Sequence, residues 1–290
     1  MALSVSGSLM HPTITNVYVD CFNLYYGIRS RGPYKWVDVR SMCRILLSNS
    51  QISRIRGFTA RVSSRPQDPS QHIRQQAYLR ALQTNPGLSI HFGHFLASTP
   101  YMPGAPLRTS GPPAMVQVVK TEEKGSDVNL ATDLLCGAFD RDYETAAVIS
   151  NDSDLSTPID VVRKRFRLDV VVINPHKTPS AELKRVATSI YDVHDSTLKR
   201  SQFPPRLHDA HGVITRPALW DECAWRRGIN IARPAGDWLR NARACPNCSS
   251  ITPGSTIADP LFESAAHRDH SMSPCPGCQQ MIERPMKGTW

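Results

Sequence analysis

The sequence lacks an apolar run long enough to cross a membrane, and its first residues lack the pattern of a secretory signal. Runs such as residues 170–173 extend over only a few positions, whereas a membrane helix needs roughly 18. No Lys or Arg precedes an apolar core near the N-terminus. We therefore expect a cytoplasmic protein without a membrane partner.

Acidic residues are scarce relative to basic ones, with 25 Asp and Glu against 34 Lys and Arg and a formal net charge of +9. The apolar share of 40% and the charged share of 20% are those of a globular chain, so disorder and fibrous repeats are excluded. The positive excess favours a polyanionic partner such as RNA. The alternative is a cationic surface that has no such partner.

Two signatures of redox enzymes are also missing. No G-x-G-x-x-G follows a predicted strand, so the chain lacks the fingerprint of a dinucleotide-binding fold. No pair of His residues with a carboxylate has the spacing of a non-haem iron site. Both absences weigh against an oxygenase that is supplied with hydride by a nicotinamide cofactor.

Strand-like and helix-like segments alternate along the first two thirds of the chain. Continuous apolar stretches at residues 146–150 and 169–173 are typical of strands that are buried on both faces. The alternation predicts an α/β domain with a mainly parallel sheet and helices on both faces. The other predicted strands cover residues 16–21, 55–62, 89–96, 115–119 and 190–193, and the predicted helices cover 37–47, 70–82, 126–139, 157–166 and 180–188.

The character of the sequence changes after this region. Residues 13–195 form the predicted main domain, within which Ser98 to Pro113 holds five prolines and is expected to be a loop or an extended excursion. Residues 196–241 are rich in Arg, Pro and Trp, and we expect a connector that packs on the main domain. Residues 242–290 hold the last four cysteines and form a third segment.

Carboxylates cluster where predicted strands end and where a predicted helix begins. Asp20 closes the first strand with Asn23 close behind it, and Asp152 and Asp154 directly follow the strand at residues 146–150. Because the carboxyl ends of parallel strands meet at one edge of a sheet, these side chains are expected to converge. The alternative for Asp20 is a helix cap without a role in chemistry.

Two further acids lie in the predicted helix at residues 126–139. Asp127 and Asp133 are six residues apart and lie on different faces of an ideal helix, so both reach one site only if Asp127 stands where the helix begins. Crowded carboxylates repel one another unless a cation binds between them. All-oxygen ligation suits Mg²⁺ or Mn²⁺, and such a cation beside a basic surface is typical of phosphodiester hydrolysis.

These segments resemble the NYN domain, a branch of the PIN-like nuclease fold that includes the LabA-type proteins. The resemblance covers residues 13–195 and rests on VYVDCFNLYYG at 17–27, KGSDVNLATDLL at 124–135 and VISNDSDLSTPI at 148–159. It implies a PIN-like three-layer sandwich whose acidic pocket binds one or two divalent metals and cleaves RNA. Residue by residue, it implies metal ligation by Asp20, Asp127, Asp152 and Asp154, an orienting role for Asn23, and a fifth acid at Asp133.

The same resemblance leaves two other functions open. A NYN-like domain has been assigned to a bacterial pyridine-ring hydroxylase of nicotine degradation. That assignment implies an NADH-dependent monooxygenase acting on a small aromatic substrate, 6-hydroxy-3-succinoylpyridine. The other alternative is a non-catalytic module that binds RNA or a protein.

The last four cysteines form two CxxC pairs, Cys245 with Cys248 and Cys275 with Cys278. Each pair presents two thiolates to one ion, and two pairs complete a tetrahedral site. We therefore expect structural Zn²⁺ in a zinc-ribbon-like module, the alternative being four reduced thiols. His267 and His270 lie between the pairs, and either could replace a thiolate.

Overall fold

The structure is a computed structural model that describes residues 11–65, 68–104, 111 and 113–221. The chain divides into two compact units, residues 1–216 and residues 217–290. In the second unit the description covers only residues 217–221, which include the short 3-10 turn Ala218–Trp220. The predicted zinc-ribbon-like module, its four cysteines and its two histidines therefore lie outside the described residues.

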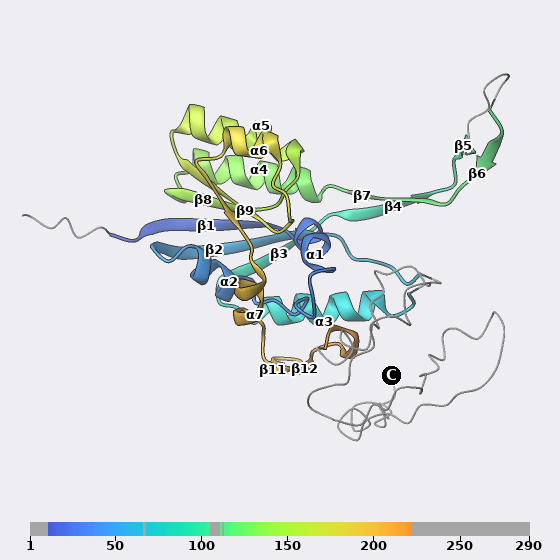
Figure 1. The fold of residues 1–290 in the computed structure, drawn as a ribbon, viewed down its shortest axis with the longest axis horizontal. Coiled ribbons are helices and arrows are strands. Elements are labelled where there is room, and N and C mark those ends of the chain that lie inside the picture. The colour runs from blue at the N-terminus through green and yellow to red at the C-terminus, as the bar shows by residue number, and fades with distance from the viewer. Residues whose placement is uncertain (1–10, 66–67, 105–110, 112, 222–290) are drawn as a thin grey trace, which may run out of the picture. The chain divides into compact units, whose positions relative to one another are not determined.

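The first unit is built on a six-stranded sheet with the strand order β10-β9-β8-β1-β2-β3 (Figure 1). Every neighbouring pair in this sheet is parallel, so all six carboxyl ends point the same way. The strands are β1 Thr13–Asp20, β2 Ser50–Thr59, β3 Leu88–Phe92, β8 Thr145–Ile149, β9 Asp169–Asn174 and β10 Ser189–Asp192.

Helices cover both faces of this sheet and complete a three-layer sandwich, which confirms the predicted α/β, PIN-like fold class (Figure 1). One face carries α4 Ser126–Phe139, α5 Ser156–Val161 with its π-helical continuation η2 Val162–Phe166, and α6 Ala181–Val186. The other carries α2 Val39–Leu46, α3 Gln71–Gln83 and α7 Asp195–Arg200, while α1 Cys21–Ile28 follows directly on β1. None of the helices within the described ranges is both long and apolar enough to span a lipid bilayer.

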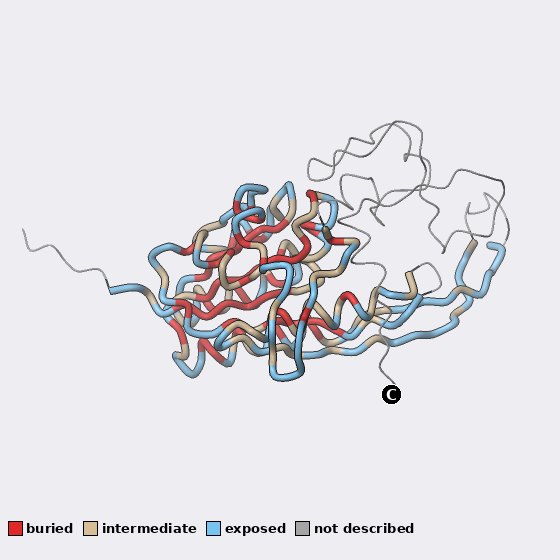
Figure 2. Tube along the Cα trace, turned by 90° about the horizontal axis from the view of Figure 1, so that it is seen from below, coloured by how far each residue is buried: buried red, intermediate tan, exposed pale blue. Residues whose placement is uncertain are grey.

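The core lies along β1, β8 and β9, most of whose residues are buried; buried stretches run through the middle of the first unit (Figure 2). Residues 146–149 of β8 have no exposed surface, and Tyr18 of β1 stacks on Phe58 of β2 with ring centroids 6.5 Å apart. Covering both faces of a parallel strand requires apolar side chains at every position. That requirement explains why β8 and β9 were recognisable as continuous apolar runs.

The region between β3 and α4 agrees with the prediction in part. Residues 98–113 were expected to be a loop or an extended excursion and residues 115–119 a strand, and a strand is present at Met115–Gln117. The pairing was not predicted: β4 His94–Ser98 pairs with β7 Lys120–Lys124, and β5 Tyr101–Pro103 pairs with β6 Met115–Gln117, outside the main sheet. Both pairs are antiparallel and form a ribbon, here called the arm, that extends away from the sheet (Figure 1). Pro103 is tolerated because each strand of a two-stranded ribbon has an open edge that needs no donor.

The beginning of the predicted connector is also more ordered than its sequence indicated. After α7, β11 Arg206–Asp209 and β12 Gly212–Thr215 form an antiparallel hairpin within the first unit. Arg80 of α3 makes two hydrogen bonds to the carboxylate of Asp209, at 2.9 and 2.7 Å. This pairing fixes the hairpin beside α3.

Candidate active site at the carboxyl edge of the sheet

Asp20 stands at the last position of β1, the strand at the centre of the sheet order. Its carboxylate caps α1 by accepting the backbone N–H of Asn23 at 2.9 Å, and its other oxygen accepts the hydroxyl of Ser150 at 3.0 Å. The residue is only 5% exposed. Asp20 is therefore a fixed, buried carboxylate whose two oxygens are both oriented by hydrogen bonds.

The loop after β8 brings the next two acids to the same edge. The Ser150 hydroxyl that donates to Asp20 also accepts the backbone N–H of Asp152 at 3.1 Å. Asp152 in turn caps the 3-10 turn Ser153–Leu155, because its carboxylate accepts the N–H of Asp154 at 3.0 Å. One serine thus couples the loop that carries Asp152 and Asp154 to the end of β1.

Asp127 reaches this edge because α4 begins there. Gly125 has a φ of 95°, a left-handed conformation that favours glycine, and it turns the chain from β7 into α4. The backbone N–H and hydroxyl of Ser126 donate to the carboxylate of Glu123, which closes that turn. Gly93 lies so close that a Cβ there would collide with the carbonyl oxygen of Lys124. Asp127 is consequently held in the first turn of α4, which is the position that it needs in order to reach the same edge as the other acids.

The electrostatics show that these carboxylates affect one another. Burial, followed by the charges of Asp127 and Asp152, raises the pKa of Asp20 to about 6. Burial also raises the pKa of Asp127, with further contributions from the charges of Asp152, Glu123 and Asp154. Charge is thus concentrated where it is unfavourable without a counterion.

The side-chain chemistry of this group suits a metal site, but the spacing of the carboxylates in this structure does not. The donors are all carboxylate oxygens, which is the set that Mg²⁺ or Mn²⁺ prefers. Within the described part of the chain, however, no three His, Cys, Asp or Glu side chains are close enough together to hold a metal ion as they stand. Asp127 and Asp152 are partly exposed and Asp154 is exposed, so solvent reaches all three side chains.

Asn23 links three segments around the acids instead of facing them as a further acid would. Its side-chain oxygen accepts the backbone N–H of Asn151 at 2.9 Å and lies 3.0 Å from Nε2 of His176. Asn151 continues the network by donating to the carbonyl of Thr178 and accepting the N–H of Ser180. Asn23 therefore orients the loops after β8 and β9.

Sequence reasoning missed Ser150 and His176. His176 lies two residues after the end of β9, so the rule that located Asp20 and Asp152 at strand ends applies to it as well. Ser150 gave no comparable signal, because a buried hydroxyl between two acids is recognisable only when both partners are placed.

The structure does not bring Asp133 to this group. Asp133 lies on another face of α4, and its carboxylate forms an ion pair with Arg56 of β2 at 2.6 Å. Arg56 also approaches Asp142, which in turn pairs with Arg54 at 2.7 Å. The proposed fifth acid is thus a member of an ion-pair network between α4 and the sheet.

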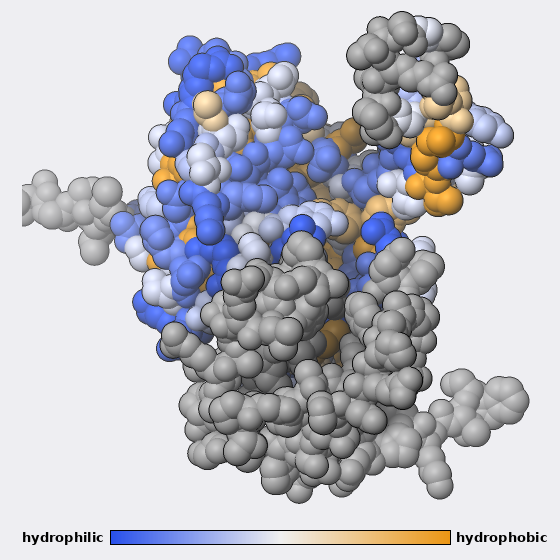
Figure 3. All heavy atoms as spheres, turned by 45° about the vertical axis from the view of Figure 1, so that its right-hand side comes forward, coloured by the Kyte–Doolittle hydropathy of each residue, from blue (hydrophilic) through white to orange (hydrophobic). Residues whose placement is uncertain are grey.

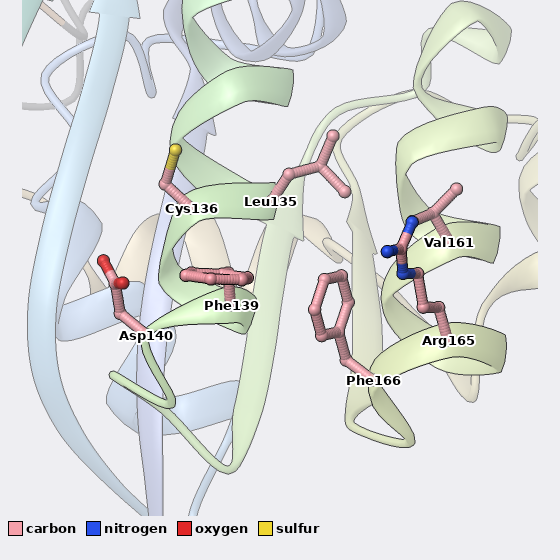
Figure 4. A pocket seen from close by; sticks show the side chains of 7 residues that line it. All are labelled: Leu135, Cys136, Phe139, Asp140, Val161, Arg165 and Phe166. Carbon is pink, nitrogen blue, oxygen red and sulfur yellow. The ribbon is translucent and has the colours of Figure 1, made fainter.

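A separate apolar hollow of about 340 Å³ lies at the other end of α4 (Figure 4). Figure 4 shows Phe139 from α4 and Phe166 from η2 bordering it, with Arg165 beside them on η2. The guanidinium carbon of Arg165 is 5.9 Å from the centroid of the Phe166 ring. Along α4, about 12 Å of helix separates Asp127 from Leu135, where this hollow begins, and about 18 Å separates it from Phe139. The remaining lining residues are Leu135, Cys136, Asp140 and Val161.

Comparison with known proteins found one relative of assigned activity and several solved structures, among them the following two. The 6-hydroxy-3-succinoylpyridine 3-monooxygenase HspA of Pseudomonas putida is 24% identical over 238 residues, which cover 72% of this chain and 76% of that protein. A protein of unknown function from Vibrio parahaemolyticus is 18% identical with a TM-score of 0.42, covering 67% of this chain and 98% of its own. MurG of Acinetobacter baumannii is 8% identical with a TM-score of 0.30, covering 67% and 43%.

The family model for the NYN domain matches residues 14–195. This stretch contains all six strands of the parallel sheet and every acid described above. The match therefore includes the scaffold and the carboxyl edge together. The chain belongs to the NYN domain family, whose fold is the nuclease-like PIN fold.

Proposed function

We propose that this protein is a ribonuclease that hydrolyses phosphodiester bonds with the help of Mg²⁺ or Mn²⁺. The observation that supports this proposal is the gathering of Asp20, Asp127, Asp152 and Asp154 around the carboxyl ends of β1 and β8 and the start of α4. Burial raises the pKa of Asp20 and of Asp127, and the charges of the neighbouring acids raise both further, so the gathering adds to the cost of ionising them. A bound cation would remove that cost and turn the same charges into ligands.

The four acids would have different roles in binding the cation, according to how firmly each side chain is held. Asp20, buried and hydrogen-bonded at both oxygens, is the fixed point of the site. Asp127, Asp152 and Asp154 would complete the ligand set from the start of α4 and the loop after β8. The cation, when bound, supplies an activated water and neutralises charge on the phosphate. Asn23 and His176 keep the two loops in register across the edge.

RNA would approach this edge over basic residues that adjoin the acids in the chain. Lys124 immediately precedes the turn into α4, and Lys177 follows His176; both are exposed. Cations at these positions would hold phosphates next to the metal site, and binding would weaken steeply as salt increases. This placement agrees with the positive net charge of the whole chain.

The test is cleavage of a fluorescent single-stranded RNA by the purified full chain, with Mn²⁺ or with EDTA. We expect cleavage with Mn²⁺, none with EDTA, and a loss of at least about 100-fold in Asp152→Asn, which keeps the shape of the side chain but removes a charged ligand. RNA that is bound but remains intact under all conditions would support the alternative of a non-catalytic binding module.

A second function, hydroxylation of a pyridine ring, is favoured by the similarity to HspA. The hollow between Phe139, Phe166 and Arg165 has the chemistry to bind an aromatic ring that carries a carboxylate, as a succinoylpyridine does. This reaction would consume one O₂ and one NADH for each ring hydroxylated. The assay follows NADH absorbance with 6-hydroxy-3-succinoylpyridine in air. Substrate-dependent oxidation that Arg165→Ala abolishes would replace the nuclease proposal.

A further inference from the structure

The arm exposes large apolar side chains that no described part of the chain covers. Tyr101 is 66% exposed and Val119 is 80% exposed, and Met102, Met115 and Val116 are each exposed by 40% or more. In Figure 3 apolar side chains gather on this projecting ribbon. Monomeric soluble proteins rarely expose a continuous apolar patch larger than a few hundred Å², and such patches mark interaction sites.

The distal part of the arm carries little charge. Between Phe95 and Lys120 the sequence contains a single charged residue, Arg108, although a fifth of the whole chain is charged. Nucleic acid is bound mainly through Lys and Arg contacts to phosphate, so this surface does not suit RNA. A neutral, apolar ribbon suits a protein surface of the same kind.

The geometry of the ribbon adds a second requirement. Beyond β4 and β7 the arm consists of two strands only, β5 and β6, and both strands have an open edge. Paired residues share a face of an antiparallel ribbon, so Met102 and Val116 lie on one face while Tyr101, Pro103 and Met115 lie on the other. An isolated two-stranded ribbon is marginally stable in water, whereas three or more strands are stable. Additional strands paired with β5 or β6 would stabilise the ribbon, and a partner surface would cover its apolar side chains.

We propose that the distal arm, residues 100–104 and 114–119, is the surface on which two copies of this chain associate. Two identical antiparallel ribbons related by a two-fold axis pair edge to edge, with β6 of one copy beside β6 of the other, and form a four-stranded sheet. Each copy carries a net charge of +9, so the copies repel one another elsewhere, and the distal arm, which has no charged residue at 100–104 or 114–119, is where they can approach.

The area suits a weak, reversible dimer. Five half-exposed large side chains contribute on the order of 100 Å² each, so at most about 500 Å² of side-chain surface per copy is available, which is the size of a transient interface. This association is independent of the proposed nuclease activity.

The test is sedimentation velocity of the full chain over a concentration range from about 1 to 100 μM, where an interface of this size is expected to respond. We expect a monomer–dimer equilibrium. Val116→Glu places like charges across the two-fold axis and should weaken the association at least about tenfold, and Val116→Lys should do the same. An equimolar mixture of the two variants should restore the dimer, because opposite charges then face each other.

Val213→Glu is the matched control, because Val213 is 54% exposed on the β11–β12 hairpin and lies outside the arm. It should leave the dimer intact. A wild type that remains monomeric at every concentration would overturn the proposal, as would a Val116→Glu variant that dimerises as tightly as Val213→Glu or a mixture that stays monomeric. A monomer that sediments with lipid vesicles would assign the arm to a membrane surface instead.

Discussion

Asp20 is the residue at which folding and chemistry make opposite demands. It is nearly fully buried, and burial with the neighbouring acids raises its pKa to about 6. Near neutral pH it is ionised at a cost to the folded state. Asp20→Asn keeps the shape of the side chain but removes this charge.

We predict that Asp20→Asn raises the free energy of unfolding of the metal-free protein by roughly 1–2 kcal/mol at pH 7. The shift from the ordinary value of 3.8 sets an upper limit of about 3 kcal/mol, and the loss of charge-assisted hydrogen bonds to Asn23 and Ser150 reduces it. The same variant should lose most of the stabilisation that Mn²⁺ gives the wild type. Urea unfolding with and without Mn²⁺ measures both effects.

The raised pKa of Asp20 also predicts how stability changes with pH. Because its pKa is about 6 in the folded protein and 3.8 in its ordinary state, the folded chain binds more protons than the unfolded chain between these values. The free energy of unfolding contributed by this group therefore falls as pH rises from about 4 to about 6. Stability measured across this window without metal should show the decline in the wild type and a smaller one in Asp20→Asn; parallel curves would contradict the assignment.

Substitution of Asn23 tests how much its contacts with the loops after β8 and β9 contribute to stability. Asn23→Ala removes the acceptor for the N–H of Asn151 and the contact with His176. We expect a loss of about 1–3 kcal/mol in stability, because a half-buried donor is left without its partner. His176→Ala removes only one of the two contacts and should cost less. Equal losses in the two variants, measured by urea unfolding, would show that Asn151 does not depend on Asn23.

At the scale of elements, helix α4 separates two acids that sequence alone could not assign to different roles. Asp127 lies in its first turn beside the other acids, while Asp133 faces the sheet and pairs with Arg56. We predict that Asp133→Asn lowers stability by roughly 1–3 kcal/mol, because Arg56 loses a largely buried partner, but leaves Mn²⁺ affinity unchanged. Asp127→Asn should lower the affinity for Mn²⁺ without lowering stability. Calorimetric titration with Mn²⁺ and thermal melts of both variants check this contrast.

The elements that the sequence predicted best are those in which several local signals agree. Helix α4 was predicted with both ends correct, because a preceding glycine, a polar start and an amphipathic run all indicate the same helix. The excursion and the strand at β6 were predicted, but the pairing within the arm was missed. An exposed two-stranded ribbon has no buried face and hence no periodic pattern, and its prolines indicate a loop. The site followed the same logic: acids at strand ends were recognisable, whereas the partner of Asp133 depends on which strand α4 packs against.

At the scale of the whole molecule, the chain joins a NYN domain to a cysteine-rich end. The four cysteines at 245, 248, 275 and 278 lie outside the described residues, and their role as ligands of structural zinc stays a prediction. We predict about one zinc per chain by elemental analysis, and a loss of this zinc in a Cys245→Ser, Cys248→Ser double variant. The cooperative melt of the α/β domain should be unchanged, because that domain has a core of its own. Wild-type protein free of zinc would contradict this prediction.

Under the proposed function, the acids at the carboxyl edge hold a cation that assists RNA cleavage. The initial rates of RNA cleavage by the wild type, Asp152→Asn and Asp133→Asn are compared at one Mn²⁺ concentration, after melts have shown that each variant is folded. We expect Asp152→Asn to lose at least about 100-fold, while Asp133→Asn stays within about twofold of the wild type. Cleavage by Asp152→Asn at the wild-type rate, or equal losses in the two variants, would show that the edge acids do not hold such a cation.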